Sequence, residues 1–210
     1  MRLLLIRHGQ SVGNAAQRIQ GLQDEPLTVV GRAQALALGQ RLQNGYDICA
    51  LYASPLLRAH ETAEIITGLQ GLTVTCDDRL KEYDCGVVTG MCFEEVTSQY
   101  PEIARGWQKD PWRVPIPGEE GLDVFQQRVL SAMHDIIASH EEKDTAAVVA
   151  HGGTLGAILA GLLGLDFRKR QPWVFDNASL SMVVLGGVRP RLTLLNDTCH
   201  LNHAPKERNP

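Results

Sequence analysis

Two short apolar segments, each followed by histidine and glycine, constrain the fold of this chain most strongly. Arg2 to Ile6 leads into Arg7-His8-Gly9, and Thr145 to Ala150 leads into His151-Gly152-Gly153. An apolar run of this length is typical of a strand that is buried on both faces of a parallel sheet. The second unit continues into Thr154 to Leu163, an almost wholly apolar helical segment. We therefore predict two strands that end in histidine-bearing loops.

Other segments have apolar residues at the spacing of a helix with one buried face. Thr28 is the predicted N-cap of the first of them, and Gly45 and Gly68 are the predicted terminators of the first two. Arg58 then lies in the first turn of the second. The helices are predicted over Thr28 to Leu42, Ser54 to about Thr67, Phe93 to Tyr100 and Leu122 to His140.

Short strand-like segments separate these helices. They are Ile48 to Ala53, Leu72 to Thr75, Leu180 to Leu185 and Arg191 to Leu195. The alternation predicts an α/β protein with three layers, α/β/α, around a mixed, mostly parallel central sheet. Ligands of such folds bind beyond the carboxyl ends of parallel strands, so we expect His8 and His151 at the binding site.

One segment departs from this alternation. From Pro101 to Gly121, prolines alternate with Trp107 and Trp112, which predicts an irregular segment. We interpret it as part of a lid inserted at about residues 91–121. The length of 210 residues suits one domain that spans residues 1–210.

The composition excludes several classes of protein. A net charge of −4 and a pI near 6.0 argue against nucleic acid or an anionic membrane as partner. The apolar run after Met1 is much too short for a signal peptide or a membrane span. The five cysteines form no CxxC pair, so we expect free thiols in a cytoplasmic protein, with neither a disulfide framework nor a zinc site. Self-association into a homo-oligomer stays open.

Five motifs in order along residues 2–165 carry a family resemblance. They are Arg7-His8-Gly9 with Asn14, Pro26-Leu27-Thr28, Ser54-Pro55-Leu56-Leu57-Arg58-Ala59, Leu80-Lys81-Glu82, and Val149-Ala150-His151-Gly152-Gly153. Together they resemble the histidine phosphatase superfamily, in its phosphoglycerate mutase-like branch and in the compact phosphatase form. A single Arg-His-Gly would be weak evidence, because a histidine after a strand is often structural.

The resemblance implies roles for five residues. His8 is expected to attack phosphorus through one ring nitrogen while a backbone carbonyl holds the other, and Arg7 and Arg58 to clamp the phosphate oxygens. His151 is expected to be the second imidazole, and Glu82 to protonate the leaving oxygen. These residue types suit phosphoryl transfer, which needs an in-line nucleophile, positive charge and a proton.

Secondary site residues and departures from the family pattern complete the expectation. Asn14, Gln20, Gly21 and Gly152 are expected to line the phosphate or the substrate. After Glu82 the chain lacks the Trp-Glu-Gly ending of many relatives, and Pro117 to Gly121 stands where relatives have Gly-Gly-Glu-Ser. Substrate contacts beyond Glu82 therefore do not transfer from the family.

We expect a phosphomonoester hydrolase that acts on a small phosphorylated metabolite through phosphohistidine, without a metal or cofactor. Two alternatives are a cofactor-dependent phosphoglycerate mutase and a catalytically silent protein that binds phosphorylated ligands. By the resemblance, mutases of this family have a longer insert between the acid and the second histidine, and basic residues that bind the substrate carboxylate and second phosphate. Here His151 follows Glu82 by 69 positions and the predicted lid has few basic residues, which favours the hydrolase over the mutase. The chain has no phosphate-binding GxxxxGK[ST] loop and no Rossmann fingerprint.

Overall fold

The computed structural model describes residues 1–109, 114–169 and 173–201. Its central element is one six-stranded sheet, in which β3, β2, β4, β1, β5 and β6 are neighbours in this order. The strands are β1 (Arg2–Arg7), β2 (Ala50–Ala53), β3 (Val74–Cys76), β4 (Thr145–Ala150), β5 (Leu180–Val184) and β6 (Arg191–Asp197).

Helices occupy most of the rest of the described chain. The α-helices are α1 (Val12–Ala15), α2 (Val29–Gly45), α3 (Leu57–Gln70), α4 (Phe93–Gln99), α5 (Pro101–Lys109), α6 (Leu122–Ala138) and α7 (Gly152–Leu163). Single 3-10 turns are η1 (Asp78–Leu80), η2 (Gly86–Val88) and η3 (Cys199–Leu201).

The sheet is mixed and mostly parallel, as the sequence predicts. β1 pairs in parallel with β4, β4 with β2, and β2 with β3, whereas β5 runs antiparallel to both β1 and β6. In the pairing of β1 with β4, Arg7 lies opposite Ala150. The two histidine-bearing loops therefore leave the sheet at the same level, from neighbouring strands.

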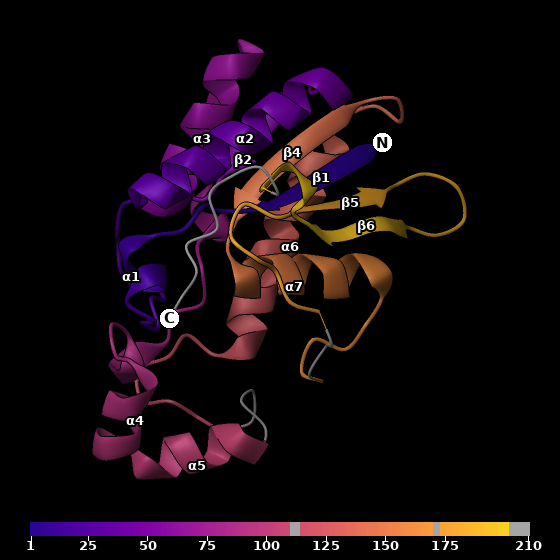
Figure 1. The fold of residues 1–210 in the computed structure, drawn as a ribbon. Helices are drawn as coiled ribbons and strands as arrows, with labels where there is room; N and C mark the ends of the chain where they lie inside the picture. The colour runs from indigo at the N-terminus through magenta and orange to yellow at the C-terminus, as the bar shows by residue number, and fades with distance from the viewer. Residues whose placement is uncertain (110–113, 170–172, 202–210) are drawn as a thin grey trace.

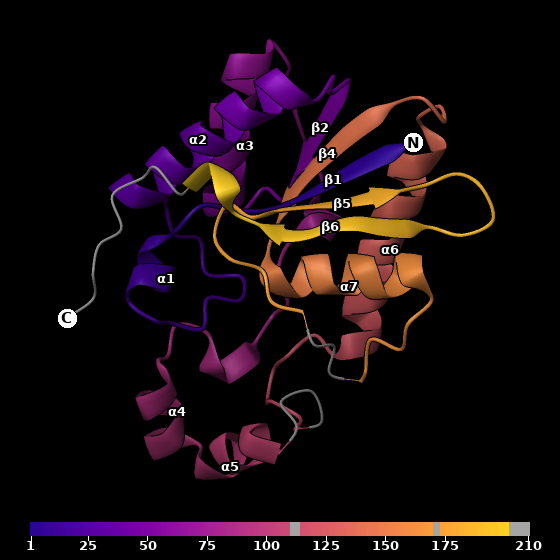
Figure 2. The ribbon, with the colours of Figure 1, turned by 45° about the vertical axis from the view of Figure 1, so that its right-hand side comes forward.

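The sheet lies between two helical layers, which confirms the predicted three-layer fold (Figure 1). Leu4 and Ile6 of β1 pack in the core cluster shared with α2 and α3, whereas Leu3 and Leu5 pack in the cluster shared with α6 and α7. Figure 2 shows α7 and α6 on one side of the sheet and α2 and α3 on the other. Because both faces of β1 are covered, every position from Leu3 to Ile6 is apolar and buried.

Helix boundaries confirm one predicted cap and correct two predicted ends. The Thr28 side chain accepts a hydrogen bond from the backbone N–H of Gly31 and caps α2. Gly45 is the last residue of α2 and does not lie past its end. The prediction of Gly68 as terminator of α3 is wrong, since the helix continues to Gln70 and Gly71 adopts the left-handed conformation (φ 69°) that ends it.

The prediction of an irregular segment from Pro101 is also wrong in its first part, because residues 101–109 form α5. Proline is tolerated at the first position of a helix, and Ile103, Ala104 and Trp107 then fall on one face. Ile103 and Ala104 are buried in a separate small cluster with Val96 of α4. The segment predicted to be a lid is thus partly helical and has a small core of its own, although Trp112 lies outside the described residues.

Across residues 1–109, 114–169 and 173–201, no helix is long and apolar enough to span a membrane.

Candidate active site

The two histidines of the sequence motifs lie beside each other at the ends of β1 and β4, with their rings tilted. The His8 backbone N–H donates to the carbonyl of Ala150 (3.0 Å), so the strand pairing continues up to the site. The centroids of the His8 and His151 rings are 5.2 Å apart, with an angle of 59° between the ring planes. Both side chains are almost fully buried.

The backbone fixes the tautomer of His8. Its Nδ1 lies 2.7 Å from the carbonyl oxygen of Gly9, which can only accept a hydrogen bond, so Nδ1 carries the proton. In the neutral ring the unprotonated nitrogen is then Nε2. The Gly9 loop is held in turn by the bond from its N–H to Thr62 Oγ1 (3.0 Å). A Cβ at Gly9 would lie 2.5 Å from the carbonyl oxygen of Gly31 in α2, so this approach requires glycine.

His151 is oriented by a serine. Its Nε2 lies 2.8 Å from Ser54 Oγ, at the end of β2, while its Nδ1 is buried without a hydrogen-bond partner among the described residues. When the Ser54 hydroxyl donates to Nε2, Nδ1 carries the proton and can donate to a ligand. His151 is also the N-cap residue of α7, where free backbone N–H groups favour an anion.

Two buried guanidinium groups lie beside the histidines. Arg58 is only 1% exposed and donates to the carbonyl oxygens of Gly21 (2.8 Å) and Gln23 (2.7 Å). Arg7 donates to the carbonyl oxygen of Phe175. In both side chains Nε is buried and has no partner among the described residues. Burial lowers the pKa of each guanidinium, against the opposing effect of Glu82, from a starting value so high that both stay charged.

Burial and the two arginines keep both imidazoles neutral. Burial lowers the pKa of His8 well below its usual 6.5, and Arg7 and Arg58 lower it further. The pKa of His151 is lowered well below 6.5 by the same causes, with burial the largest. A neutral His8 whose Nε2 is unprotonated can act as a nucleophile.

Glu82 reaches the site from the loop after η1. Its Oε1 accepts hydrogen bonds from the N–H groups of Tyr83 (2.9 Å) and Thr154 (3.1 Å) and from the Thr154 hydroxyl (3.3 Å). Its Oε2 accepts one, from the Gly153 N–H (2.9 Å). A Cβ at Gly153 would lie 2.5 Å from Oε1, so glycine is needed where the carboxyl group meets the start of α7.

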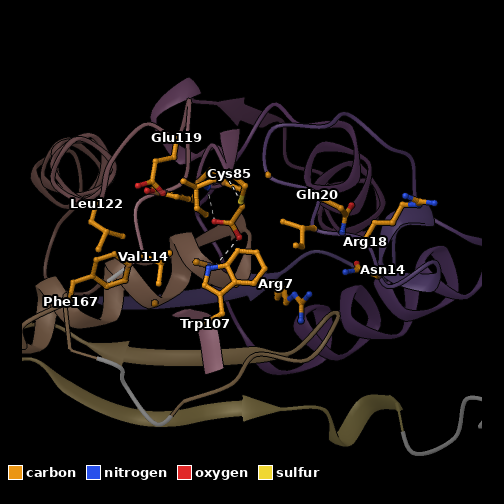
Figure 3. Close-up of a pocket in the computed structure, with 18 of the residues that line it drawn as sticks. Arg7, Asn14, Arg18, Gln20, Cys85, Trp107, Val114, Glu119, Leu122 and Phe167 are labelled. Atoms are coloured by element: carbon orange, nitrogen blue, oxygen red, sulfur yellow. Dashed lines mark hydrogen bonds between the residues drawn. The ribbon is translucent and has the colours of Figure 1, made fainter. Parts of the chain in front are cut away.

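Most of these residues line a cavity of about 800 Å³, although His151 is not among its lining residues. Arg7, His8, Arg58 and Glu82 line it, together with the predicted secondary residues Asn14, Gln20, Gly21 and Gly152. We call this part of the cavity, which contains the buried His8 and Arg58, its inner end. Figure 3 shows Asn14, Gln20 and Arg18 on one side of the pocket and Leu122 and Phe167 on the other.

The predicted secondary residues have distinct contacts. Asn14 Oδ1 accepts from the backbone N–H of Ser11 (3.1 Å) and from Asn177 (3.0 Å), and Gln20 Oε1 accepts from the Ser11 hydroxyl (2.7 Å), so their amide nitrogens are the atoms left for a ligand. Gly21 contributes the carbonyl that holds Arg58.

Sequence reasoning missed the residue that holds the Glu82 segment in place. Arg128 of α6 donates to the backbone carbonyls of Arg79, Lys81 and Glu82 at 2.8–2.9 Å. Its other donors form a bidentate pair with Glu120 (2.6 and 2.8 Å), at the end of the lid. Arg128 lies on the helix face that the apolar periodicity assigns to solvent, so only the tertiary structure reveals its role.

A cysteine thiol also faces the cavity. Cys85 lines the cavity, but burial raises the pKa of its thiol to about 12, so it is not a thiolate near neutral pH. The described residues contain no group of three or more His, Cys, Asp or Glu side chains placed to hold a metal ion.

The low histidine pKa values predict how stability depends on pH. The unfolded chain takes up a proton at each histidine near pH 6.5, whereas folded His8 and His151 do so only at lower pH. Their contribution to the free energy of unfolding is therefore fully present above pH 6.5 and is lost as the pH falls below it. Between pH 6 and 5, His8→Asn should make the fall in unfolding free energy shallower by up to about 1.4 kcal/mol per pH unit.

Urea unfolding in phosphate-free buffer at several pH values measures this slope. The matched control is His134→Asn, because the His134 side chain is 82% exposed. A slope for His8→Asn equal to that of the wild type would contradict the buried, neutral state of His8.

Comparison with known proteins identifies the family of this chain. Residues 3–198 match the family model described as the histidine phosphatase superfamily, branch 1. Phosphoserine phosphatase 1 of Hydrogenobacter thermophilus is 36% identical over 201 residues, which cover 96% of this chain and 94% of that protein. A protein of Yersinia pestis named as a probable phosphoglycerate mutase is 33% identical over 183 residues, covering 87% and 84%.

A solved structure shows the same fold. The crystal structure of the alpha-ribazole phosphatase from Shigella flexneri superposes with a TM-score of 0.83 at 27% identity and covers 94% of this chain and 97% of that one. The family match spans β1 to β6 and includes every residue of the site described above. The chain therefore belongs to the histidine phosphatase superfamily and is an enzyme of that family.

Proposed function

We propose that this enzyme hydrolyses phosphomonoesters of a small metabolite in two steps, with His8 as the nucleophile. One observation carries the proposal. Three buried nitrogen atoms of the side chains around His8 have no partner among the described residues: Arg7 Nε, Arg58 Nε and His151 Nδ1. Buried donors are rarely left unpaired, and a phosphoryl group offers oxygens that can accept from all of them.

In the first step, His8 Nε2 attacks phosphorus and forms the N–P bond while the P–O bond to the leaving alcohol breaks. Arg7, Arg58 and His151 stabilise the charge on the phosphoryl oxygens. Glu82 supplies the proton that the leaving oxygen takes. We assign this proton to Oε2, because Oε2 accepts one hydrogen bond and Oε1 accepts three.

In the second step, the Glu82 carboxylate takes a proton from a water molecule, which attacks phosphohistidine. The N–P bond breaks, inorganic phosphate forms, and His8 returns to its neutral form. Covalent catalysis thus replaces one difficult displacement by two easier ones.

The outer part of the cavity supports hydrolysis over mutase chemistry. A phosphoglycerate mutase must hold a substrate carboxylate as well as the phosphate. Beyond Arg7 and Arg58, the arginines in the described lining are Arg18 and Arg168, and both are paired with carboxylates at 3.1 and 2.5 Å. The short distance in sequence between Glu82 and His151 agrees with this choice.

The first prediction separates hydrolysis from phosphoryl transfer between metabolites. Without added bisphosphoglycerate, the enzyme should release stoichiometric inorganic phosphate from n-propyl phosphate, because water is then the final acceptor. Malachite-green detection of phosphate measures it, and His8→Asn is the inactive reference.

A parallel assay for interconversion of 2- and 3-phosphoglycerate with bisphosphoglycerate present provides the contrast. Rapid interconversion with little phosphate release would identify a mutase. Binding of phosphate esters with neither reaction would identify a silent binding protein.

The second prediction concerns the segment that carries Glu82. General-acid help matters most for an alkyl ester, whose alkoxide is far more basic than the nitrophenolate expelled from p-nitrophenyl phosphate. Glu82→Gln should slow phosphoenzyme formation about 10²–10⁴-fold on n-propyl phosphate and much less on the nitrophenyl ester.

Arg128→Lys should also slow phosphoenzyme formation on n-propyl phosphate, by about 10-fold or more, and less on the nitrophenyl ester. The reason is that an ammonium group cannot replace the five directed donors of the guanidinium that hold the Glu82 segment.

Single-turnover rapid quench measures this step for both esters. Arg79→Lys is the matched control, since its guanidinium lies on the same segment but pairs with the partly exposed Asp77 and Asp135. Equal losses on the two esters would show that Glu82 organises the pocket and donates no proton, and equal losses for Arg79→Lys and Arg128→Lys would remove the positioning role.

A further inference from the structure

The outer wall of the active-site cavity is apolar and largely aromatic. It is built from four separate segments of the chain, and its apolar side chains include Trp107, Ile116, Leu122, Phe167 and Trp173. In the view of Figure 3, the Trp107 ring lies between Arg7 on one side and Val114, Leu122 and Phe167 on the other. An organic group attached to a phosphate at the inner end would therefore contact carbon atoms and ring faces.

The two arginines at the rim of this wall, Arg18 and Arg168, are paired with carboxylate groups. Arg168 pairs with Asp123 (2.5 Å), and Arg18 pairs with Glu95 (3.1 Å) while it also donates to the Gly90 carbonyl. Both arginines lie at the exposed rim, where such pairs are weak but where solvent also screens a ligand charge.

A further carboxyl group, that of Glu119, is less exposed than these two arginines. Glu119 lines the cavity, and its carboxylate accepts a hydrogen bond from the Tyr83 hydroxyl. A ligand carboxylate would meet a like charge there, whereas ligand hydroxyl groups could donate to Glu119.

We propose that the substrate is a phosphate monoester with a large, uncharged, aromatic body and without a carboxylate group. This rests on the phosphatase activity proposed above. The volume of about 800 Å³ lies in the range of sites that enclose drug-sized ligands, so a three-carbon amino-acid or glycerate phosphate would leave the aromatic wall without contact. A flat aromatic body buries its faces against Trp107 and its neighbours.

Three alkyl phosphates with primary alcohols as leaving groups distinguish recognition of the organic group from the reactivity of the phosphate ester. They are n-propyl phosphate, 3-phenylpropyl phosphate and O-phosphoserine. Burial of one ring should raise kcat/KM for 3-phenylpropyl phosphate about 10- to 100-fold above that for n-propyl phosphate. The kcat/KM for O-phosphoserine should be no higher than that for n-propyl phosphate.

Variants of the wall assign the effect to named residues. Trp107→Leu should lower the ratio of phenylpropyl to propyl kcat/KM about 2- to 10-fold, and Trp107→Phe should keep most of it. Glu119→Gln should raise kcat/KM for O-phosphoserine relative to n-propyl phosphate several-fold, because the like charge is gone. Val188→Ala, at a 99% exposed position between β5 and β6, is the control that should change neither ratio.

The outcomes separate this inference from the function on which it rests. No phosphate release from any of the three esters would overturn the phosphatase itself, because n-propyl phosphate tests the chemistry without either recognition element. Release with equal kcat/KM for the phenylpropyl and propyl esters would overturn the aromatic subsite alone. A preference for O-phosphoserine that Arg168→Ala abolishes would show that the rim arginine binds the substrate carboxylate, contrary to the proposal.

Discussion

The site depends on two guanidinium groups that are buried next to two imidazoles and are not paired with a carboxylate of the described residues. Burial of an unpaired charge costs free energy, and neither Arg7 nor Arg58 forms an ion pair within 4 Å in the described part of the chain. Backbone carbonyls accept hydrogen bonds from the two guanidinium groups instead: those of Gly21 and Gln23 from Arg58, and that of Phe175 from Arg7. The positive charge is therefore fixed in position and still available to a phosphoryl group.

The same charge sets the protonation of the histidines. A positive group beside an imidazole opposes a second positive charge, and burial acts in the same direction, so the lowered pKa keeps His8 neutral in the free protein. The bound phosphoryl group then supplies negative charge, which stabilises any imidazolium that forms. In the proposed mechanism, the two arginines thus keep His8 unprotonated and bind the phosphoryl group with one arrangement of charge.

Much of the fold and the inner site could be predicted, because both depend on local signals. Leu3 to Ile6 had to be apolar since β1 is covered on both faces, and the neighbouring ends of β1 and β4 bring His8 and His151 together. Thr28 is recognisable as a cap because its hydroxyl has one obvious use. Family motifs then indicated Arg58 and Glu82, which lie in the cavity at its inner end.

Most of the errors came from positions where tertiary contacts decide. Pro101 and the prolines after it predict an irregular segment, but proline can also begin a helix, and here the apolar face of that helix, with Ile103, packs on α4. The prediction of Gly68 as a helix end is wrong for a local reason, since a second glycine follows three positions later: α3 continues to Gln70, and Gly71 adopts the left-handed conformation that ends it. Arg128 was invisible, because its use depends on backbone carbonyls more than 40 positions away in the sequence.

The most direct test of the account is to find the covalent intermediate. Wild-type enzyme is mixed with a ³²P-labelled alkyl phosphate, quenched in alkali within one turnover, digested, and mapped by mass spectrometry. The account predicts a label on His8 that survives alkali, is lost in acid, and is missing from the His8→Asn variant. A label that persists in that variant, or turnover of the wild type without any labelled enzyme under these conditions, would contradict His8 as the nucleophile.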